Sequence, residues 1–315
     1  MTPEESEDVG RNSGQQAIWN VIQNHNTLCL CGAEPPHKLK VLNRVNTMKK
    51  PDPEKDLPLL RKHVERMIIT TEKVIERRFS YDESDHYAFM LLCFLMKQSE
   101  HVRSVAILVD AAQCRDATAI ARMMLEGMST LMWAACDREN RPLQWRAFAL
   151  VSDWELLNEK KASGENVDSE MEKRLSTRLK QHGPKYLTKR ARKEGANDSD
   201  CRFQKTWLLD TEGSHITRSS MFEEIKGESL YELYEDFSQW LHWTPRALGD
   251  CIERNDDGGT TYNPNSYHHA AQALVVAFLA TLQTLQLAYE HFKIQSNPPL
   301  DQLKKEFLKD VGIEI

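Results

Sequence analysis

Twenty consecutive residues of this 315-residue chain, 270–289, carry no charged side chain. A helix of that length is long enough to cross the hydrocarbon core of a bilayer. Five polar residues interrupt the stretch, however: Gln272, Thr281, Gln283, Thr284 and Gln286. The rest of the chain is strongly hydrophilic and contains no second stretch of this kind. A helix that is apolar on all sides is also typical of the centre of a helical core, so we expect a buried central helix and no membrane span.

Apolar residues recur at steps of three and four along most of the chain, and few segments alternate with the two-residue period of a strand. The clearest stripe contains Leu57, Leu60, Val64, Met67, Ile68, Thr71 and Ile75. Asp82 and Asp85 indicate an N-terminal cap for a long helix through residues 86–112. The pattern predicts an all-α fold, a multi-helix bundle with a basic helical insertion.

The composition changes along the chain in a way that predicts separate parts. The stretch from Met171 to Lys205 is polar, poor in large apolar residues and broken by Gly183-Pro184 and Gly195, which is typical of an insertion. We expect a polar N-terminal extension with one short helix and a loop over residues 1–56, and a helical core domain formed by residues 57–165 together with 206–292. Residues 166–205 are predicted to form a basic helical insertion in this core domain, and residues 293–315 an amphipathic C-terminal tail.

The cysteines and the first residues indicate a compartment. The chain has seven cysteines, an odd number, and most stand alone in apolar helical stretches, which is typical of reduced thiols in a cytosolic protein. Residues 1–15 are acidic and polar and lack the basic and apolar regions of a secretory signal. We therefore expect a cytoplasmic protein.

Arg122 and Glu126 are the charged residues of an otherwise uncharged stretch between Asp116 and Asp137. They are four residues apart and therefore share one face of the predicted helix. Because their neighbours are Met, Leu, Ile and Ala, we expect the pair to be buried. A buried ion pair is a weak way to stabilise a core, so it is either a device that fixes helix register or a functional site.

A second polar stripe lies in the sequence SLYELYEDFSQWLHW. Tyr231, Tyr234, Ser238 and His242 follow one another at steps of three, four and four, which places them on one helical face. A histidine one turn after a serine could deprotonate the hydroxyl, and tyrosines can hold a phosphate or a base. The alternative is a histidine whose ring nitrogens are satisfied inside a helical core.

These features in this order resemble an uncharacterised bacterial family, an all-helical domain of unknown function. The shared features are an Arg-x-x-x-Glu in an apolar helix, then a tryptophan, then a tyrosine-rich helix that ends in Ser-x-x-x-His. Here they are Arg122 with Glu126, then Trp207, then Tyr231 and Tyr234 followed by Ser238 and His242. The resemblance covers about residues 57–289 and implies a helical fold with a polar centre, but no particular reaction.

Motifs for metals and nucleotides are weak. Cys29 and Cys31 lie near His25 and His37, but the C-x-C spacing lacks the second half of a zinc site. Adjacent His268 and His269 diverge by about 100° on a helix and do not readily share one metal. The sequence has no GxxxxGK[ST] motif and no GxGxxG after a strand. We therefore expect no metal and no cofactor.

The segment from Lys173 to Lys205 contains eleven Lys or Arg and three acidic residues, a local charge of +8 that leaves −14 for the rest. The chain as a whole, at −6, does not attract nucleic acid, so such binding has to use a local patch of this kind. We single out Lys189, Arg190, Arg192 and Lys193 as candidate binding residues, with Tyr231 and Tyr234. The alternative is a solvated pair of helices that balances the acidic body.

Three functional readings follow, in descending order of support. The first is a helical effector or regulator of a prokaryotic cell, in a defence or toxin system, that binds nucleic acid or a protein partner. The second is an enzyme acting on a nucleotide or nucleic acid at a pocket with Arg122, Glu126, Ser238 and His242. The third is a structural homodimer without an active site.

Overall fold

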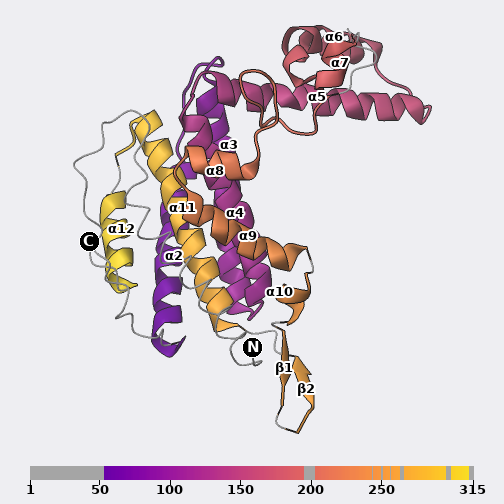
Figure 1. Ribbon diagram of the computed structural model, residues 1–315. Coiled ribbons are helices and arrows are strands. Elements are labelled where there is room, and N and C mark those ends of the chain that lie inside the picture. Colours follow the sequence, from indigo (N-terminus) through magenta and orange to yellow (C-terminus); the bar gives the residue numbers. More distant parts are fainter. Residues whose placement is uncertain are drawn as a thin grey trace.

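The structure, a computed structural model, describes residues 53–194, 203–242, 244–249, 251–255, 257–262, 266–295 and 299–311. Four long helices form its centre: α2 (Pro53–Ile75), α3 (His86–Asp110), α4 (Cys114–Ala135) and α11 (Tyr267–Phe292). They run side by side as an elongated bundle (Figure 1). The all-α prediction is confirmed. Of the predicted N-terminal extension, residues 1–52 lie outside the described part of the chain.

Helix α11 is the centre of the bundle. It begins where the Ser266 side chain accepts a hydrogen bond from the backbone N–H of His269 and ends at Lys293, whose φ is +53°. By length and composition it is long and apolar enough to cross a membrane, and 89% of its apolar window is buried inside the structure. Thr281 and Thr284 are fully buried with their apolar neighbours. The helix is thus apolar on all sides because other helices surround it.

Helix α3 begins as its sequence predicts. The Asp85 carboxylate accepts a 2.8 Å hydrogen bond from the backbone N–H of Ala88, which satisfies one free donor of the first turn. Tyr87, Leu91 and Leu95 then follow along the buried face, in contact with α4 and α11. The polar cap and the apolar face together fix both the start and the orientation of this helix.

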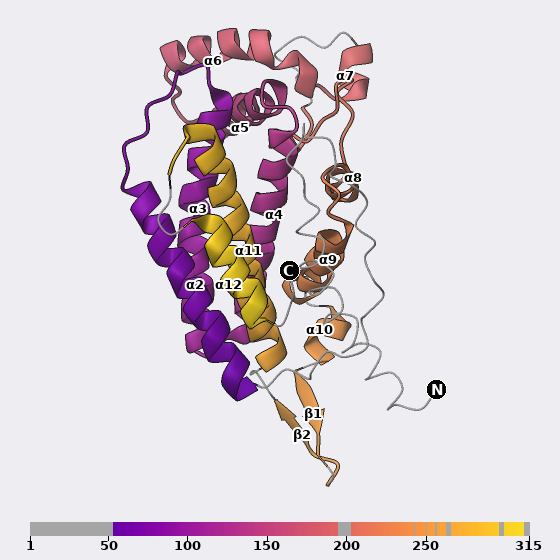
Figure 2. The ribbon, with the colours of Figure 1, turned by 90° about the vertical axis from the view of Figure 1, so that its left-hand side faces the viewer.

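A second layer lies across one end of the bundle (Figures 1 and 2). It consists of α5 (Asn140–Ala162), α6 (Ser169–His182), a 3₁₀ turn η1 (Pro184–Tyr186) and α7 (Lys189–Lys193). We call these elements the platform. The platform has a separate apolar core, made of Ala147, Leu150, Val151, Trp154, Leu157, Leu175, Leu179, Tyr186, Phe203 and Leu209. The basic insertion therefore packs against α5, a helix that we assigned to the core domain.

Short elements line one side of α4. Helix α8 (Arg218–Glu224) and helix α9 (Glu228–Leu241) contact α4, and α10 (Pro245–Gly249) follows. Strands β1 (Ile252–Arg254) and β2 (Thr260–Tyr262) then form an antiparallel hairpin in which Ile252 pairs with Tyr262. This hairpin extends beyond the end of the bundle (Figure 1).

The last helix, α12 (Leu300–Asp310), packs on α2 and α11 (Figure 2). Phe307 is fully buried and stacks on Phe278 of α11, with ring centroids 3.9 Å apart. The buried ring of His63 on α2 meets both phenyl rings edge-on and is hydrogen bonded to Asp310 at 2.9 Å. The segment that we expected to be a tail thus contributes α12 to the main core.

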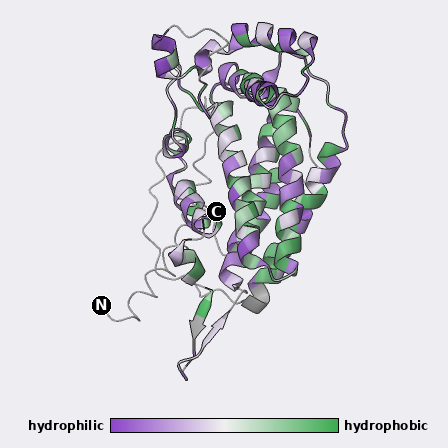
Figure 3. Ribbon diagram, turned by 90° about the vertical axis from the view of Figure 1, so that its right-hand side faces the viewer, coloured by the Kyte–Doolittle hydropathy of each residue, from purple (hydrophilic) through white to green (hydrophobic). Residues whose placement is uncertain are grey.

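Hydrophobic residues concentrate in the bundle, whereas α6 and α7 are largely hydrophilic (Figure 3).

Candidate functional site

One polar stripe of α4 faces α8 and α9 instead of the bundle centre. It contains Arg122, Glu126, Thr130 and Trp133, which follow at steps of four, four and three and therefore share a helical face. Each of these residues makes a side-chain contact with α8 or α9. The stripe thus fixes a layer that comes from a distant part of the sequence.

Arg122 binds two side chains of α9. Its Nε donates a 2.7 Å hydrogen bond to Ser238 Oγ, and its Nη2 donates a 2.5 Å hydrogen bond to Tyr234 Oη. The guanidinium carbon also lies 4.3 Å from the centroid of the Tyr234 ring, a cation–π distance. The structure therefore brings together three of the residues that the sequence places in the candidate site.

Glu126 bridges two arginines. Its Oε2 lies 3.4 Å from Arg122 Nη1, while its Oε1 pairs closely with Arg218 Nη2. Arg218 in turn donates a 3.3 Å hydrogen bond to Thr130 Oγ1. Two guanidinium groups thus share one carboxylate, and these three groups together carry a net positive charge.

The expectation that the Arg122–Glu126 pair is buried is wrong. The side chain of Arg122 is 15% exposed and that of Glu126 is 29% exposed, so the pair lies at the rim of the bundle. The reason is that α4 turns this stripe toward the thin α8–α9 layer, which leaves part of it open to solvent. The apolar neighbours of the pair in sequence occupy the other faces of the helix.

Sequence reasoning missed Arg218 as a site residue. It is 92 positions from Glu126 and stands in the first turn of α8, after the N-cap Thr217. A cation in the first turn of a helix opposes the helix dipole, which is a weak sign that it is held by another interaction. The other end of α8 is also fixed, because Glu224 accepts hydrogen bonds from Trp133 Nε1 at 2.6 Å and from Arg141 at 2.5 Å.

The side chains of Ser238 and His242 are not hydrogen bonded to each other; only the backbone N–H of His242 donates to the Ser238 carbonyl, at 3.1 Å. The Ser238 hydroxyl donates a 2.6 Å hydrogen bond to the Tyr234 carbonyl and accepts one from Arg122. His242 is the residue after the last turn of α9, and its side chain is exposed. The stripe that we extended to His242 ends with the helix, because the 3.6-residue period no longer applies beyond Leu241. The Ser238 hydroxyl is therefore committed to its own helix and lacks a base among the described residues.

The other predicted site tyrosine points elsewhere. Tyr231 Oη donates a 2.7 Å hydrogen bond to Glu235, and this bond raises the pKa of Tyr231. Its ring lies nearly parallel to that of Tyr234, with centroids 6.1 Å apart. Tyr231 thus supports Tyr234 from the side and does not contact Arg122. Trp207, the tryptophan of the predicted motif, packs on Trp133 with ring centroids 5.7 Å apart.

The four predicted binding residues of the basic segment lie on α7 and differ in their roles. Lys189 and Lys193 are exposed, and Arg190 pairs with Glu194 at 2.6 Å. Arg192 instead donates hydrogen bonds to the carbonyls of Glu212 and Gly213, at 2.8 and 2.9 Å. Arg192 therefore fixes a loop of the platform, and its side chain is not free to bind a ligand.

The described residues contain no group of three or more His, Cys, Asp or Glu arranged to hold a metal ion. Cys29, Cys31, His25 and His37 lie outside these residues. His269 Nδ1 is 2.6 Å from Ser266 Oγ, and burial lowers the pKa of this histidine to about 3.

Comparisons with known proteins agree with the expected kind of family. No curated protein and no solved structure matches the chain. The family DUF5677, described as a family of unknown function, matches residues 88–260. That region runs from α3 to β2 and includes every residue of the Arg122 site, whereas α2, α11 and α12 lie outside it. Because the match covers more than half of the chain, the protein belongs to the DUF5677 family.

Proposed function

We propose that the protein is a helical effector or regulator that binds the phosphate backbone of a double-stranded nucleic acid with its platform. The observation that carries this proposal is a set of exposed cations on the platform: Lys173, Arg174, Arg178, Lys185, Lys189 and Lys193. Within the described chain, none of them forms an ion pair with an acidic side chain. Unpaired cations of this kind neutralise phosphates without reading the sequence.

The aromatic residues of the basic segment 173–205 favour a duplex over a single strand. Binding of single strands depends on exposed aromatic rings that stack on the bases. Tyr186 is fully buried, and Phe203 is 6% exposed, so both rings belong to the platform core. The basic segment therefore offers charge without exposed aromatic rings, which suits the backbone of a duplex.

The experiment measures the affinity of the full chain for a DNA or RNA duplex as a function of salt concentration by fluorescence anisotropy. The slope of log K against log salt is about −0.9 per phosphate neutralised. Replacing Lys173, Arg178, Lys189 and Lys193 with Gln is expected to flatten this slope by up to about 4 and to weaken binding at low salt. Arg192 is left in place because it fixes the loop at Gly213.

A matched control removes the same charge from the bundle. Lys62 and Lys73 on α2 and Lys305 and Lys309 on α12 are also exposed, and their replacement with Gln is expected to leave the slope unchanged. An absence of binding at low salt, or equal effects of the two quadruple variants, would contradict the proposal.

An enzyme acting on a nucleotide at the Arg122 site is the second candidate. It is favoured by the two guanidinium groups that share Glu126 at a partly exposed position, because such a site suits a phosphate. Catalysis by Ser238, however, requires a base within hydrogen-bond reach of its hydroxyl. The exposed position of His242 and the bond from Ser238 to the Tyr234 carbonyl do not meet that requirement, so we rank binding first.

The setting of this activity in a prokaryotic cell, in a defence or toxin system, is part of the same proposal. The resemblance of the sequence to bacterial helical proteins supports the prokaryotic setting.

A further inference from the structure

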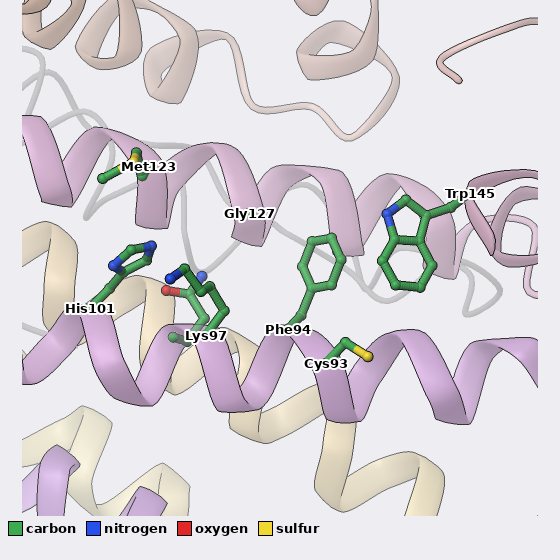
Figure 4. Close-up of a pocket in the computed structure, with 8 residues that line it drawn as sticks. Cys93, Phe94, Lys97, His101, Met123, Gly127 and Trp145 are labelled. Carbon is green, nitrogen blue, oxygen red and sulfur yellow. The ribbon is translucent and has the colours of Figure 1, made fainter. Parts of the chain in front are cut away.

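A groove lies between α3 and α4, on a different part of the molecule from the platform surface and the Arg122 site. It encloses about 240 Å³ and is lined by Cys93, Phe94, Lys97, Gln98, His101, Met123, Gly127 and Trp145. Trp145 belongs to α5 and closes one end beside Phe94, and His101 lies at the other end opposite Met123 (Figure 4). The lining is mostly apolar and aromatic, as in sites for small organic molecules.

One residue of the groove lining, Gln98, has an unsatisfied hydrogen-bond acceptor. Gln98 is 3% exposed, and its Nε2 donates a 2.9 Å hydrogen bond to the Met124 carbonyl. Its Oε1 is buried and has no partner among the described residues. Leaving a buried carbonyl oxygen unpaired costs about 1–3 kcal/mol, so a ligand that displaces the side chains covering this oxygen and donates a hydrogen bond to it gains affinity.

Glycine at position 127 keeps the groove open. A Cβ atom there would lie 3.3 Å from Gln98 Nε2 and 3.9 Å from Phe94 Cδ1, in the space between the two helices. Glycine in a helix interior costs about 1 kcal/mol relative to alanine. The outer wall, by contrast, is made of the exposed and flexible side chains of Lys97 and Met123, which can move outward to admit a ligand.

The shape and charge of the lining narrow the chemistry of the ligand. A cavity of roughly 150 Å³ holds benzene, and drug-sized ligands need roughly 300 Å³ or more, so the groove suits one or two fused rings. Phe94 and Trp145 meet edge to face with centroids 5.6 Å apart, which presents aromatic surface to a planar ring. Lys97 at the mouth is paired with Glu100 at 3.0 Å, so the lining carries no uncompensated charge and suits a neutral ligand.

We propose that this groove binds a small, neutral, planar aromatic molecule that donates one hydrogen bond to Gln98 Oε1. Binding is noncovalent. Burial raises the pKa of the Cys93 thiol and keeps it protonated, and burial together with the Lys97 ammonium lowers the pKa of His101, so its ring is neutral at pH 7. The groove therefore binds by shape and by a single directed hydrogen bond.

The test compares two probes of nearly equal shape, indole, which has an N–H donor, and indene, which does not. Calorimetric titration of the full chain is expected to show saturable binding of both, with indole favoured by about ten-fold, the worth of one hydrogen bond. Gln98→Leu replaces the acceptor with an apolar side chain of similar size, so it is expected to abolish the preference for indole and to retain the binding of indene.

Two further variants separate a groove ligand from adsorption on apolar surface. Met96→Ala removes a 58% exposed side chain of the same helix outside the groove, and it is expected to change neither affinity. Gly127→Ala fills the space beside Gln98 and Phe94 and is expected to weaken the binding of both probes. It is not expected to lower the melting temperature, because alanine has a higher helix propensity than glycine. Failure of the wild-type protein to bind either probe, or an indole preference that survives Gln98→Leu, would overturn the proposal.

Discussion

Glu126 holds Arg122 and Arg218 in place, and removing its charge leaves two guanidinium groups facing each other. We expect Glu126→Gln to lower the free energy of unfolding by about 1–3 kcal/mol, since hydrogen bonds to charged groups contribute on this order and partial exposure reduces the effect. Urea denaturation measures this change.

The controls for this variant use its partner and a nearby exposed residue. In a double-mutant cycle with Arg218→Gln, the two changes should not add, because both break the same ion pair. His242→Gln, at the exposed end of α9, should leave the midpoint unchanged. Additive effects in the cycle would mean that Glu126 and Arg218 do not interact, and a large effect of His242→Gln would mean that its ring packs.

The sequence predicted part of this site at the level of single residues. The four-residue spacing of Arg122 and Glu126 placed them on one face of α4, and the spacing of Tyr234 and Ser238 placed them on one face of α9. Arg218 could not be predicted, because its pairing depends on how α8 packs against α4. The local period says which face a residue occupies, but it does not say which distant element covers that face.

The N-terminus of α11 gives a stability prediction at the level of an element. Ser266 Oγ accepts the backbone N–H of His269 at 3.3 Å, and its own proton is available for His269 Nδ1 at 2.6 Å. This arrangement requires a neutral imidazole, and the helix dipole also disfavours a cation at this end. Burial accordingly lowers the pKa of His269 to about 3.

Above the ordinary histidine pKa of about 6.5, His269 is neutral in both the folded and the unfolded chain, and the free energy of unfolding has its full value. As the pH falls from about 6.5 toward 3, the unfolded chain binds a proton at His269 and the folded chain does not. The free energy of unfolding therefore falls by up to about 1.4 kcal/mol per pH unit over this range. We expect His269→Gln to flatten the fall in melting temperature between about pH 7 and about pH 4.5. Parallel pH profiles for the variant and the wild-type protein would contradict this.

Elements with a strong local pattern were predictable, and those that depend on packing were not. The Asp85 cap of α3 and the uncharged stretch of α11 were visible in the sequence, and both helices are present. The amphipathic pattern of α12 was recognised, but the segment was assigned to a tail, so its contact with α2 and α11 was missed. The strands of the hairpin have three residues each, which is too short for a two-residue period to be recognised.

At the scale of the whole molecule, α12 closes the main core. Phe307 is fully buried between Phe278 and His63, so Phe307→Ala is expected to lower the free energy of unfolding by about 3–5 kcal/mol through lost burial and a cavity. Ile107→Ala, at a 64% exposed position on α3, is the control and should have little effect. Thermal or urea unfolding measures both, and similar midpoints would mean that α12 does not belong to the cooperative core.

Helix α5 is shared by the two cores of the molecule. Trp145 in its first turns packs with the bundle, whereas Trp154 and Leu157 pack inside the platform. The helix runs between them without a glycine, and its proline, Pro142, lies in the first turn, where it does not interrupt the backbone hydrogen bonds. A continuous helix of this kind is a rigid connection and not a hinge. The basic helices α6 and α7 are therefore held at a set angle to the bundle axis, and the duplex that we propose as their ligand would be oriented with respect to the whole molecule.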